Sequence, residues 1–284
     1  MNEFSELKKS VSNNLSNFKL NPVQAIFTAF IVIVALQLIA AFVTIPFGFI
    51  KNLEPLGMPL GFLIGGLSAI FLSITYVKTK WKFIVDHLLN PISLMVLILS
   101  VLLFLFMVPF TEYVTSIVPT EGIPILEELY KVMSGHFESM FSNNYRKITG
   151  FITVCILAPI IEEILFRGII LRGLLQYGAS PIMAIFLSSF LFGLAHLNPW
   201  QFLGAGILGA IFGYVYYRTQ SLWLPVFLHT LNNCISFFFL MKYKSMDVNV
   251  TDVDSSTSVT IFFILGLICA WIIYKLTKNK QPWI

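Results

Sequence analysis

Five ionisable side chains interrupt long apolar stretches in the second half of the sequence. Glu162, Glu163 and Arg167 lie in the segment APIIEEILFRGIILRG, and His196 and His229 lie in two later apolar runs. On insertion scales, an ionisable group placed inside a bilayer costs about 2.5–3.5 kcal/mol. A structural ion pair accounts for two such groups and not for five, so the sequence predicts a buried polar site.

The spacing of the first three residues separates their roles. Glu163 and Arg167 are four residues apart, so they share one face of a helix and can form an ion pair. Glu162 is turned by about 100° from Glu163 around an α-helix, which lets it face a different space. We expect Glu163 and Arg167 to support the helix and Glu162 to be the reactive carboxylate; a second pairing of Glu162 with Arg167 is the alternative.

Two more motifs repeat the four-residue spacing. Phe192 and His196 occur in FLFGLAHLNPW, and His229 and Asn233 occur in PVFLHTLNNC. Three helices would thus offer polar groups to one interior space. Taken singly, either histidine could simply hydrogen-bond a neighbouring backbone, and Asn232 competes with Asn233 as the amide that faces the site.

A carboxylate, two imidazoles and an amide around a water molecule suit hydrolysis. Glu162 could take a proton from water, and the Asn233 amide could donate to a developing oxyanion. The histidines could orient the water or polarise a carbonyl. The set His196, His229 and Glu162 also has the donor types that zinc binds, so a divalent metal and a metal-independent mechanism both remain open.

The composition is that of a membrane protein. The 284 residues are 57% hydrophobic and 11% charged, with a mean hydropathy of +0.84, whereas soluble domains have about 25% charged residues. The net charge is +4 without a basic cluster, so we expect no nucleic-acid partner.

We predict an all-α, polytopic membrane helix bundle of about eight transmembrane helices, with a catalytic cavity between helices 4, 5 and 7. The fifth and sixth spans are short and separated only by NPWQ, which indicates a tight hairpin or re-entrant helices. The predicted spans are 24–47, 58–77, 91–110, 149–171, 181–197, 201–217, 221–241 and 258–275. The expected division is 1–147 (N-terminal arm, three helices and outer loop), 148–242 (catalytic core) and 243–284 (last loop, helix and basic tail).

Lysine and arginine residues gather on one side of such a bundle, which predicts that both termini are cytoplasmic. The opposite side would carry the long segment 111–148 and the loop after the seventh span. Within the former, ILEELYKVMSGHFESMF is amphipathic and could lie along the outer interface or form a short solvated connection. Gly209 and Gly213, four residues apart, indicate close helix packing. The cations are Lys8, Lys9, Lys19, Lys78, Lys80, Lys82, Arg172, Arg218, Lys275, Lys278 and Lys280; the opposing acids are Glu112, Glu121, Glu127, Glu128, Glu138, Asp247, Asp252 and Asp254.

The ordered motifs EExxxR, FxxxH and HxxxN resemble the CAAX protease and bacteriocin-processing family, also called the CPBP or Abi family. The resemblance covers about residues 148–242, with all three motifs intact. It implies an α-helical intramembrane endopeptidase, often called a metalloprotease, with its site in a cavity between helices. The compact chain and its lysine-rich loops fit a bacterial plasma membrane. By position, Glu162 would activate the water, His196 would help to hold it, and His229 and Asn233 would complete the site. Glu163, Arg167 and Phe192 would support it.

The resemblance says little about the substrate, which we expect to be a membrane-embedded peptide or protein and not a prenylated one. Peptide or bacteriocin maturation, immunity and envelope regulation fit such a site. A non-catalytic membrane scaffold or immunity protein that binds a membrane-protein partner is the main alternative, and a proton-coupled transporter is another. The predicted boundaries leave one mismatch: Glu162 would lie about 14 Å, and His196 about 24 Å, from the cytoplasmic ends of their helices.

Overall fold

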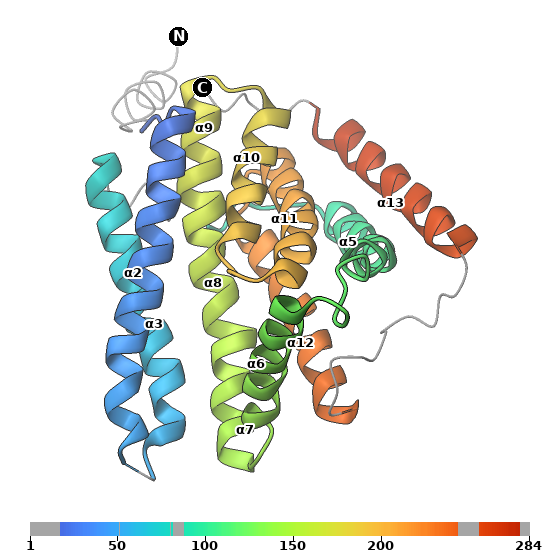
Figure 1. The fold of residues 1–284 in the computed structure, drawn as a ribbon. Coiled ribbons are helices and arrows are strands. Elements are labelled where there is room, and N and C mark those ends of the chain that lie inside the picture. The colour runs from blue at the N-terminus through green and yellow to red at the C-terminus, as the bar shows by residue number, and fades with distance from the viewer. Residues whose placement is uncertain (1–17, 51, 80, 82–87, 244–255, 279–284) are drawn as a thin grey trace.

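The computed structural model describes residues 18–50, 52–79, 81, 88–243 and 256–278. Within these ranges the regular structure is helical and no strand occurs, so the predicted all-α fold is confirmed (Figure 1). The elements are α2 (Pro22–Gly48), α3 (Glu54–Val77), α5 (Leu94–Thr115), α6 (Pro124–Met140), α7 (Asn144–Phe151), η1 (Ile152–Leu157), α8 (Ala158–Glu163), η2 (Ile164–Leu171), α9 (Arg172–Tyr177), α10 (Pro181–Leu194), α11 (Pro199–Thr219), α12 (Trp223–Tyr243) and α13 (Ser256–Thr277).

Five helices, α2, α3, α5, α12 and α13, are long and apolar enough to cross a bilayer. The chain is therefore an integral membrane protein with a polytopic helical bundle. The other three predicted spans take different forms. The fourth is a run of α-helical and π-helical segments, α10 has only 14 residues, and α11 pairs with α10 in a tight hairpin.

Local sequence signals set several helix ends. Asn21 and Gln24 form a reciprocal capping box at the start of α2, directly before and within its first turn. Asn198 caps α11 in the same position before a proline, which is the preferred residue at the first helical position. Gly178 ends α9 with φ +100°, a left-handed conformation that glycine adopts without strain.

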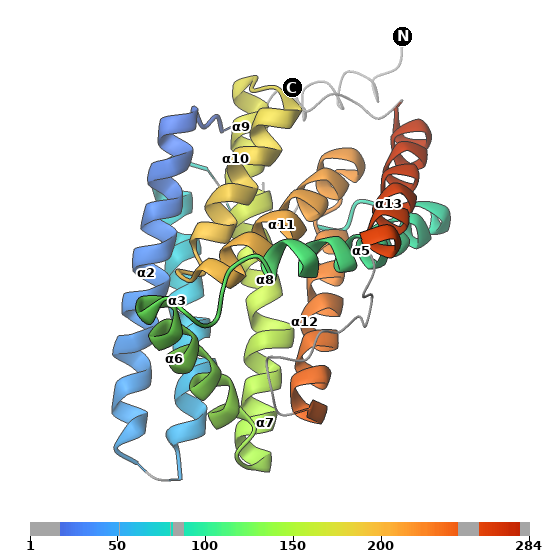
Figure 2. The same ribbon diagram turned by 45° about the vertical axis from the view of Figure 1, so that its right-hand side comes forward.

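Three helix pairs organise the bundle: α2 with α3, α10 with α11, and α5 with α13. The long helix α7–η1–α8–η2–α9 stands between the first two pairs, and α12 lies beside its lower half (Figures 1 and 2). In α3, Gly57, Gly61 and Gly65 recur every four residues on the face toward α2. A Cβ at Gly65 would lie 2.9 Å from the Leu36 carbonyl oxygen, so these small residues permit close packing.

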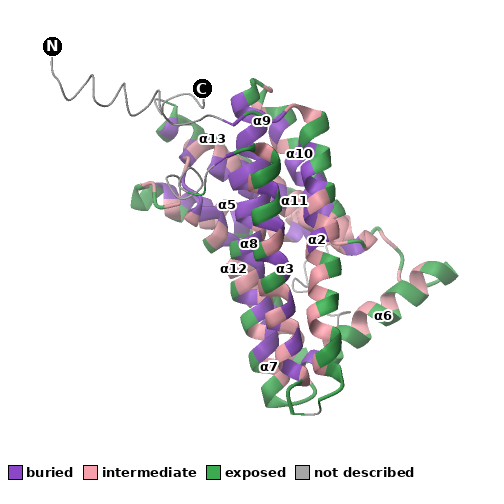
Figure 3. Ribbon diagram, turned by 90° about the vertical axis from the view of Figure 1, so that its left-hand side faces the viewer, coloured by how far each residue is buried: buried purple, intermediate pink, exposed green. Residues whose placement is uncertain are grey.

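The predicted amphipathic segment forms α6, which stands away from the bundle and joins it at α7 (Figure 3). Most of its residues are exposed or half-buried. Its end is anchored where Met140 packs into a small buried cluster with Cys155 and Phe237. The helix is confirmed; its position at a membrane interface stays a prediction.

The mismatch in depth between Glu162 and His196 came from a wrong helix boundary. The fourth predicted span ended at residue 171, but the helix continues to Tyr177 because Arg172 and Gln176 are buried with it. Glu162 is then fifteen residues from the end of its helix, and His196 is fifteen residues from Pro181. At about 1.5 Å per residue, Glu162 lies about 22 Å from that end of the bundle, and Leu194, the last helical residue before His196, lies about 20 Å from it.

Several predicted loop residues lie outside the described ranges. They are Lys8, Lys9, Lys80, Lys82, Asp247, Asp252, Asp254 and Lys280.

Candidate active site

Both site carboxylates belong to α8, a six-residue α-helical segment between the π-helical segments η1 and η2. Single π turns inside longer helices occur frequently at functional sites. The side chain of Glu163 is fully buried, whereas that of Glu162 is 18% exposed. The two adjacent carboxylates therefore have different surroundings, as their angular separation predicts.

Glu163 and Arg167 form the predicted ion pair. Arg167 Nη1 donates to Glu163 Oε1 over 2.7 Å, and neither side chain is exposed. Arg167 Nη2 donates to the Gly209 carbonyl oxygen over 3.0 Å. Its guanidinium carbon also lies 4.4 Å from the ring centre of Phe192, a cation–π contact. These contacts hold the arginine from three helical segments at once.

Gly209 has a specific function in this packing. A Cβ there would lie 3.0 Å from both Arg167 Nη2 and a ring carbon of Phe192. The predicted packing role of the glycine pattern is therefore confirmed, and at Gly209 it makes room for the buried guanidinium.

His229 connects the two glutamates. Its Nδ1 lies 2.9 Å from Glu163 Oε1, and because a carboxylate in an ion pair only accepts, Nδ1 donates. The other ring nitrogen, Nε2, is then unprotonated in the neutral ring and lies 3.8 Å from Glu162 Oε2. The ring of Phe212 stacks on the imidazole at a centroid distance of 5.5 Å. Glu163 thus fixes which nitrogen of His229 faces Glu162.

A cavity of about 500 Å³ opens in front of Glu162. The predicted residues Glu162, His196, His229 and Asn233 all line it, as does Asn232. Of the three residues predicted to support the site, Phe192 also lines the cavity, whereas Glu163 and Arg167 are buried behind the cavity wall. The structure thus brings the four predicted catalytic residues to one space.

His196 does not share a helix face with Phe192 in the expected way. Helix α10 ends at Leu194, so His196 lies in the turn that leads to α11. The side chain is still tied to the motif, because Nδ1 donates to the Phe192 carbonyl oxygen over 3.0 Å. As with His229, a bond at Nδ1 leaves Nε2 of a neutral ring as the nitrogen that can accept.

The two asparagines of α12 form a small network. Asn233 Nδ2 donates to the Val154 carbonyl oxygen of η1 over 2.8 Å, and Asn232 Nδ2 donates to Asn233 Oδ1 over 3.1 Å. The Asn233 amide therefore uses one of its two protons to join α12 to the glutamate-bearing helix.

Sequence reasoning missed two contributions to the site. Phe212, which stacks on His229, lies in an apolar run where nothing distinguishes it from other core phenylalanines. Gln201 lines the cavity from the first turn of α11. It belongs to the NPWQ segment, in which Asn198 caps α11 directly after the motif residue His196. These polar residues beside the motif could have indicated that Gln201 lies at the site.

The donor arrangement does not match a three-residue metal site. Among the residues that the structure describes, no three His, Cys, Asp or Glu side chains lie together closely enough to hold a metal ion. The Nε2 of His229 and Glu162 Oε2 face each other, but His196 does not complete a ligand triad with them. The predicted metal set stays a prediction, and no step below passes through a metal.

Comparison with known proteins agrees with the motifs. Residues 144–235 match the family model described as Type II CAAX prenyl endopeptidase Rce1-like. A Bacillus subtilis (strain 168) protein named "Putative membrane peptidase YdiL" is 37% identical over 89 residues, which are 31% of this chain and 35% of the relative. The "UPF0177 protein YaiF" of Lactococcus lactis subsp. lactis (strain IL1403) is 37% identical over 90 residues, 31% of this chain and 39% of the relative.

The matched segment thus spans between a third and two fifths of the length of these curated relatives. The residues matched by the family model, 144–235, contain all three motifs, which confirms the resemblance to the CAAX-protease family. No solved protein structure matches the chain significantly.

Proposed function

We propose that this chain, whose residues 144–235 match the CAAX prenyl endopeptidase family, is an intramembrane endopeptidase with Glu162 as general base. The observation that carries the proposal is the pair of adjacent carboxylates with opposite surroundings. Glu163 is neutralised by Arg167 and holds His229, while Glu162 faces the cavity. Buried charges that only stabilise a fold do not need a second, unpaired carboxylate beside them.

Hydrolysis would begin with a water molecule in the cavity next to Glu162. Glu162 takes one proton from the water, and the oxygen attacks the carbonyl carbon of the scissile peptide bond. His196 and His229 each present Nε2 as an acceptor that can hold this water. The second amide proton of Asn233, or an amide proton of Asn232, can donate to the negative oxygen that develops on the carbonyl.

The second half of the reaction returns the proton. The C–N bond breaks, the proton passes from Glu162 to the leaving amine, and the products are a carboxylic acid and an amine. His229 Nε2 lies 3.8 Å from Glu162 Oε2, beyond hydrogen-bond distance, so it can relay this proton only when bound substrate brings the two atoms closer together. Glu163 keeps the imidazole in the orientation that the relay needs.

The test is cleavage by the purified protein in detergent, with a library of membrane-anchored peptides read by mass spectrometry. Glu162→Gln is expected to lower the cleavage rate at least about 100-fold, since a general base contributes 10²–10⁴-fold. Glu112→Gln is the matched control, because Glu112 is a second carboxylate that lines the same cavity. It should retain most of the rate.

A folded Glu162→Gln variant that cleaves at the wild-type rate would refute the assigned base. If neither the wild type nor the Glu162→Gln variant cleaves any peptide while both are folded, a non-catalytic scaffold or immunity function is favoured over the peptidase. A parallel assay with a chelator decides the metal question, because loss of wild-type cleavage that returns on adding zinc would favour a metal mechanism.

The bacterial plasma membrane as location, and cytoplasmic ends for the chain, belong to the same proposal. Two observations support the orientation. The start of α2 and the end of α13 lie at the same end of the bundle (Figures 1 and 2). Lys19, Lys78 and Lys275 lie at helix ends there. The positive-inside rule expects an excess of such cations on the cytoplasmic side; the opposite end has Lys131, Arg146, Lys147 and Lys242 beside its acids. A membrane-anchored peptide or protein is the proposed substrate class.

A further inference from the structure

The catalytic cavity occupies one half of the bundle. On the long helix it is lined by residues from Thr153 to Glu162, and on α12 by residues from His229 to Leu240. On α3, it is lined by Met58 and Phe62, both near the start of that helix. On these three helices Glu162 and His229 lie at the inner end of the cavity, and the other lining residues extend from them toward one end of the bundle; α5 and α11 supply further walls.

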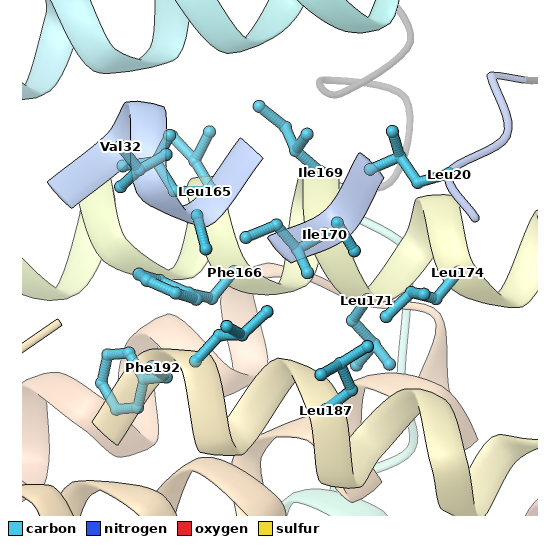
Figure 4. Packing of buried hydrophobic residues seen from close by; sticks show 14 of the residues in the cluster. Leu20, Val32, Leu165, Phe166, Ile169, Ile170, Leu171, Leu174, Leu187 and Phe192 are labelled. Carbon is cyan, nitrogen blue, oxygen red and sulfur yellow. The ribbon is translucent and has the colours of Figure 1, made fainter. Parts of the chain in front are cut away.

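The other half of the bundle is closed by packed side chains. Beyond Glu163 the long helix carries Leu165, Phe166, Ile169, Ile170, Leu171 and Leu174, none more than 1% exposed. Residues from the α2 and α10 sides, such as Val32 and Leu187, pack against this stretch (Figure 4). Water or a peptide therefore cannot reach Glu162 from that half without unpacking the core.

The closed half is the half that contains the described chain ends. The Leu20 amide donates to the Gly173 carbonyl oxygen over 3.0 Å, which places the start of α2 beside α9. At α13, Arg218 Nε donates to Thr277 Oγ1 over 3.0 Å, so the end of α11 lies beside the end of α13.

Charge distinguishes the two ends of the bundle. The described residues near the closed end include Lys19, Lys78, Arg218, Lys275 and Lys278 and no Asp or Glu. The other half contains the described acids outside the site together with four described cations. The acids are Glu54, Glu112, Glu121, Glu127, Glu128 and Glu138, and the cations are Lys131, Arg146, Lys147 and Lys242. Lysine and arginine concentrate in cytoplasmic loops, so the closed end, which has more described cations and no described acid, fits the cytoplasmic side better than the other end does.

We infer that the catalytic cavity opens to the extracytoplasmic side, so that its substrate is a membrane-anchored peptide or protein segment presented outside the cytoplasm. The substrate part of this inference rests on the proposed peptidase function, whereas the direction of the opening does not. Entry to the site is then from the half of the bundle that contains α6.

Helix α6 forms the outer wall of this opening. Met133, Phe137 and Met140 line the cavity, while Ile125 and Val132, on the neighbouring part of the same apolar arc, are 67% and 65% exposed. An amphipathic helix with apolar residues on two adjoining faces can contact substrate with one and outer-leaflet lipid with the other. The wall favours substrates with bulky apolar side chains next to the scissile bond.

The experiment is labelling of single cysteines in intact cells with a membrane-impermeant maleimide. Gln201→Cys reports on the cavity, Glu128→Cys on the exposed face of α6, and Tyr177→Cys on the opposite end of the long helix. Each is compared with the unsubstituted protein, whose native cysteines are buried or half-buried and set the background. A second measurement repeats the labelling after the membrane is permeabilised.

The expected result is that the cysteines at positions 201 and 128 are labelled in intact cells, at least about tenfold above background, while the one at position 177 requires permeabilisation. Labelling of position 177 but not of 201 in intact cells would overturn the orientation. If the cysteine at position 201, like the one at position 177, is labelled only after permeabilisation, the direction of the opening is overturned. The same holds if the cysteine at position 201 is labelled neither in intact nor in permeabilised cells. Because the assay does not require cleavage, an inactive protein that labels as expected refutes only the proposed peptidase.

Discussion

The buried Glu163–Arg167 pair offers the sharpest test of how the site is held together. Replacing Arg167 by Met keeps most of the side-chain volume but leaves the Glu163 carboxylate fully buried without its cation. Breaking a buried ion pair by removing one partner costs about 3–5 kcal/mol. The lost hydrogen bond to Gly209 and the lost contact with Phe192 act in the same direction.

Glu163→Gln is expected to cost less, because the neutral amide can still accept from His229 Nδ1. The double variant Glu163→Gln with Arg167→Met should recover at least about 1–2 kcal/mol relative to the sum of the single changes, since removing both charges is often near neutral. Reversible unfolding in mixed detergent micelles, followed by tryptophan fluorescence, gives the four free energies of the cycle. Additive changes, or an Arg167→Met cost below about 1 kcal/mol, would show that the pair does not stabilise the fold in the way described.

Two further changes test the packing around this pair. Gly209→Ala is expected to destabilise the protein by about 1–3 kcal/mol, because the new Cβ would lie 3.0 Å from Arg167 Nη2. Gly206→Ala is the control, because the nearest atom to its new Cβ would be 3.9 Å away. Equal unfolding midpoints for the two variants would contradict this reasoning. Asn233→Ala should cost about 1 kcal/mol through loss of the bond to the Val154 carbonyl oxygen, and should also slow cleavage. A variant that loses stability but cleaves at the wild-type rate would remove Asn233 from the proposed chemistry.

Much of the fold was predictable because its signals are local. Apolar runs of about 20 residues indicate spans, and Asn21, Ser93 and Asn198 each cap the helix that follows them. Where the signals are not local, the prediction failed. The end of α9 could not be placed because Arg172, which looks like an interfacial residue in the sequence, is buried in the fold.

The site was predictable in its residues and less so in its connections. Four-residue spacing identified the Glu163–Arg167 pair, because partners on one helix are read directly from the sequence. The bond from His229 to Glu163 joins residues 66 positions apart, and no periodicity indicates it. The motif placed His229 at the site, but it did not indicate that Glu163 holds one of its ring nitrogens.

The π-helical segments explain how one long helix can pack against several neighbours and also direct Glu162 toward the cavity. A regular α-helix has 3.6 residues per turn, whereas the wider π turn closes its hydrogen bonds one residue later, so each π segment shifts the angular positions of the residues that follow it. In the structure, α-helical geometry is kept for the six residues that carry Glu162 and Glu163, and a wider π turn flanks them on each side. One of these turns, η1, supplies the Val154 carbonyl oxygen that accepts from Asn233. The carboxylates are thus oriented by the helix interruptions around them, and the contact from α12 holds the same interruption in place.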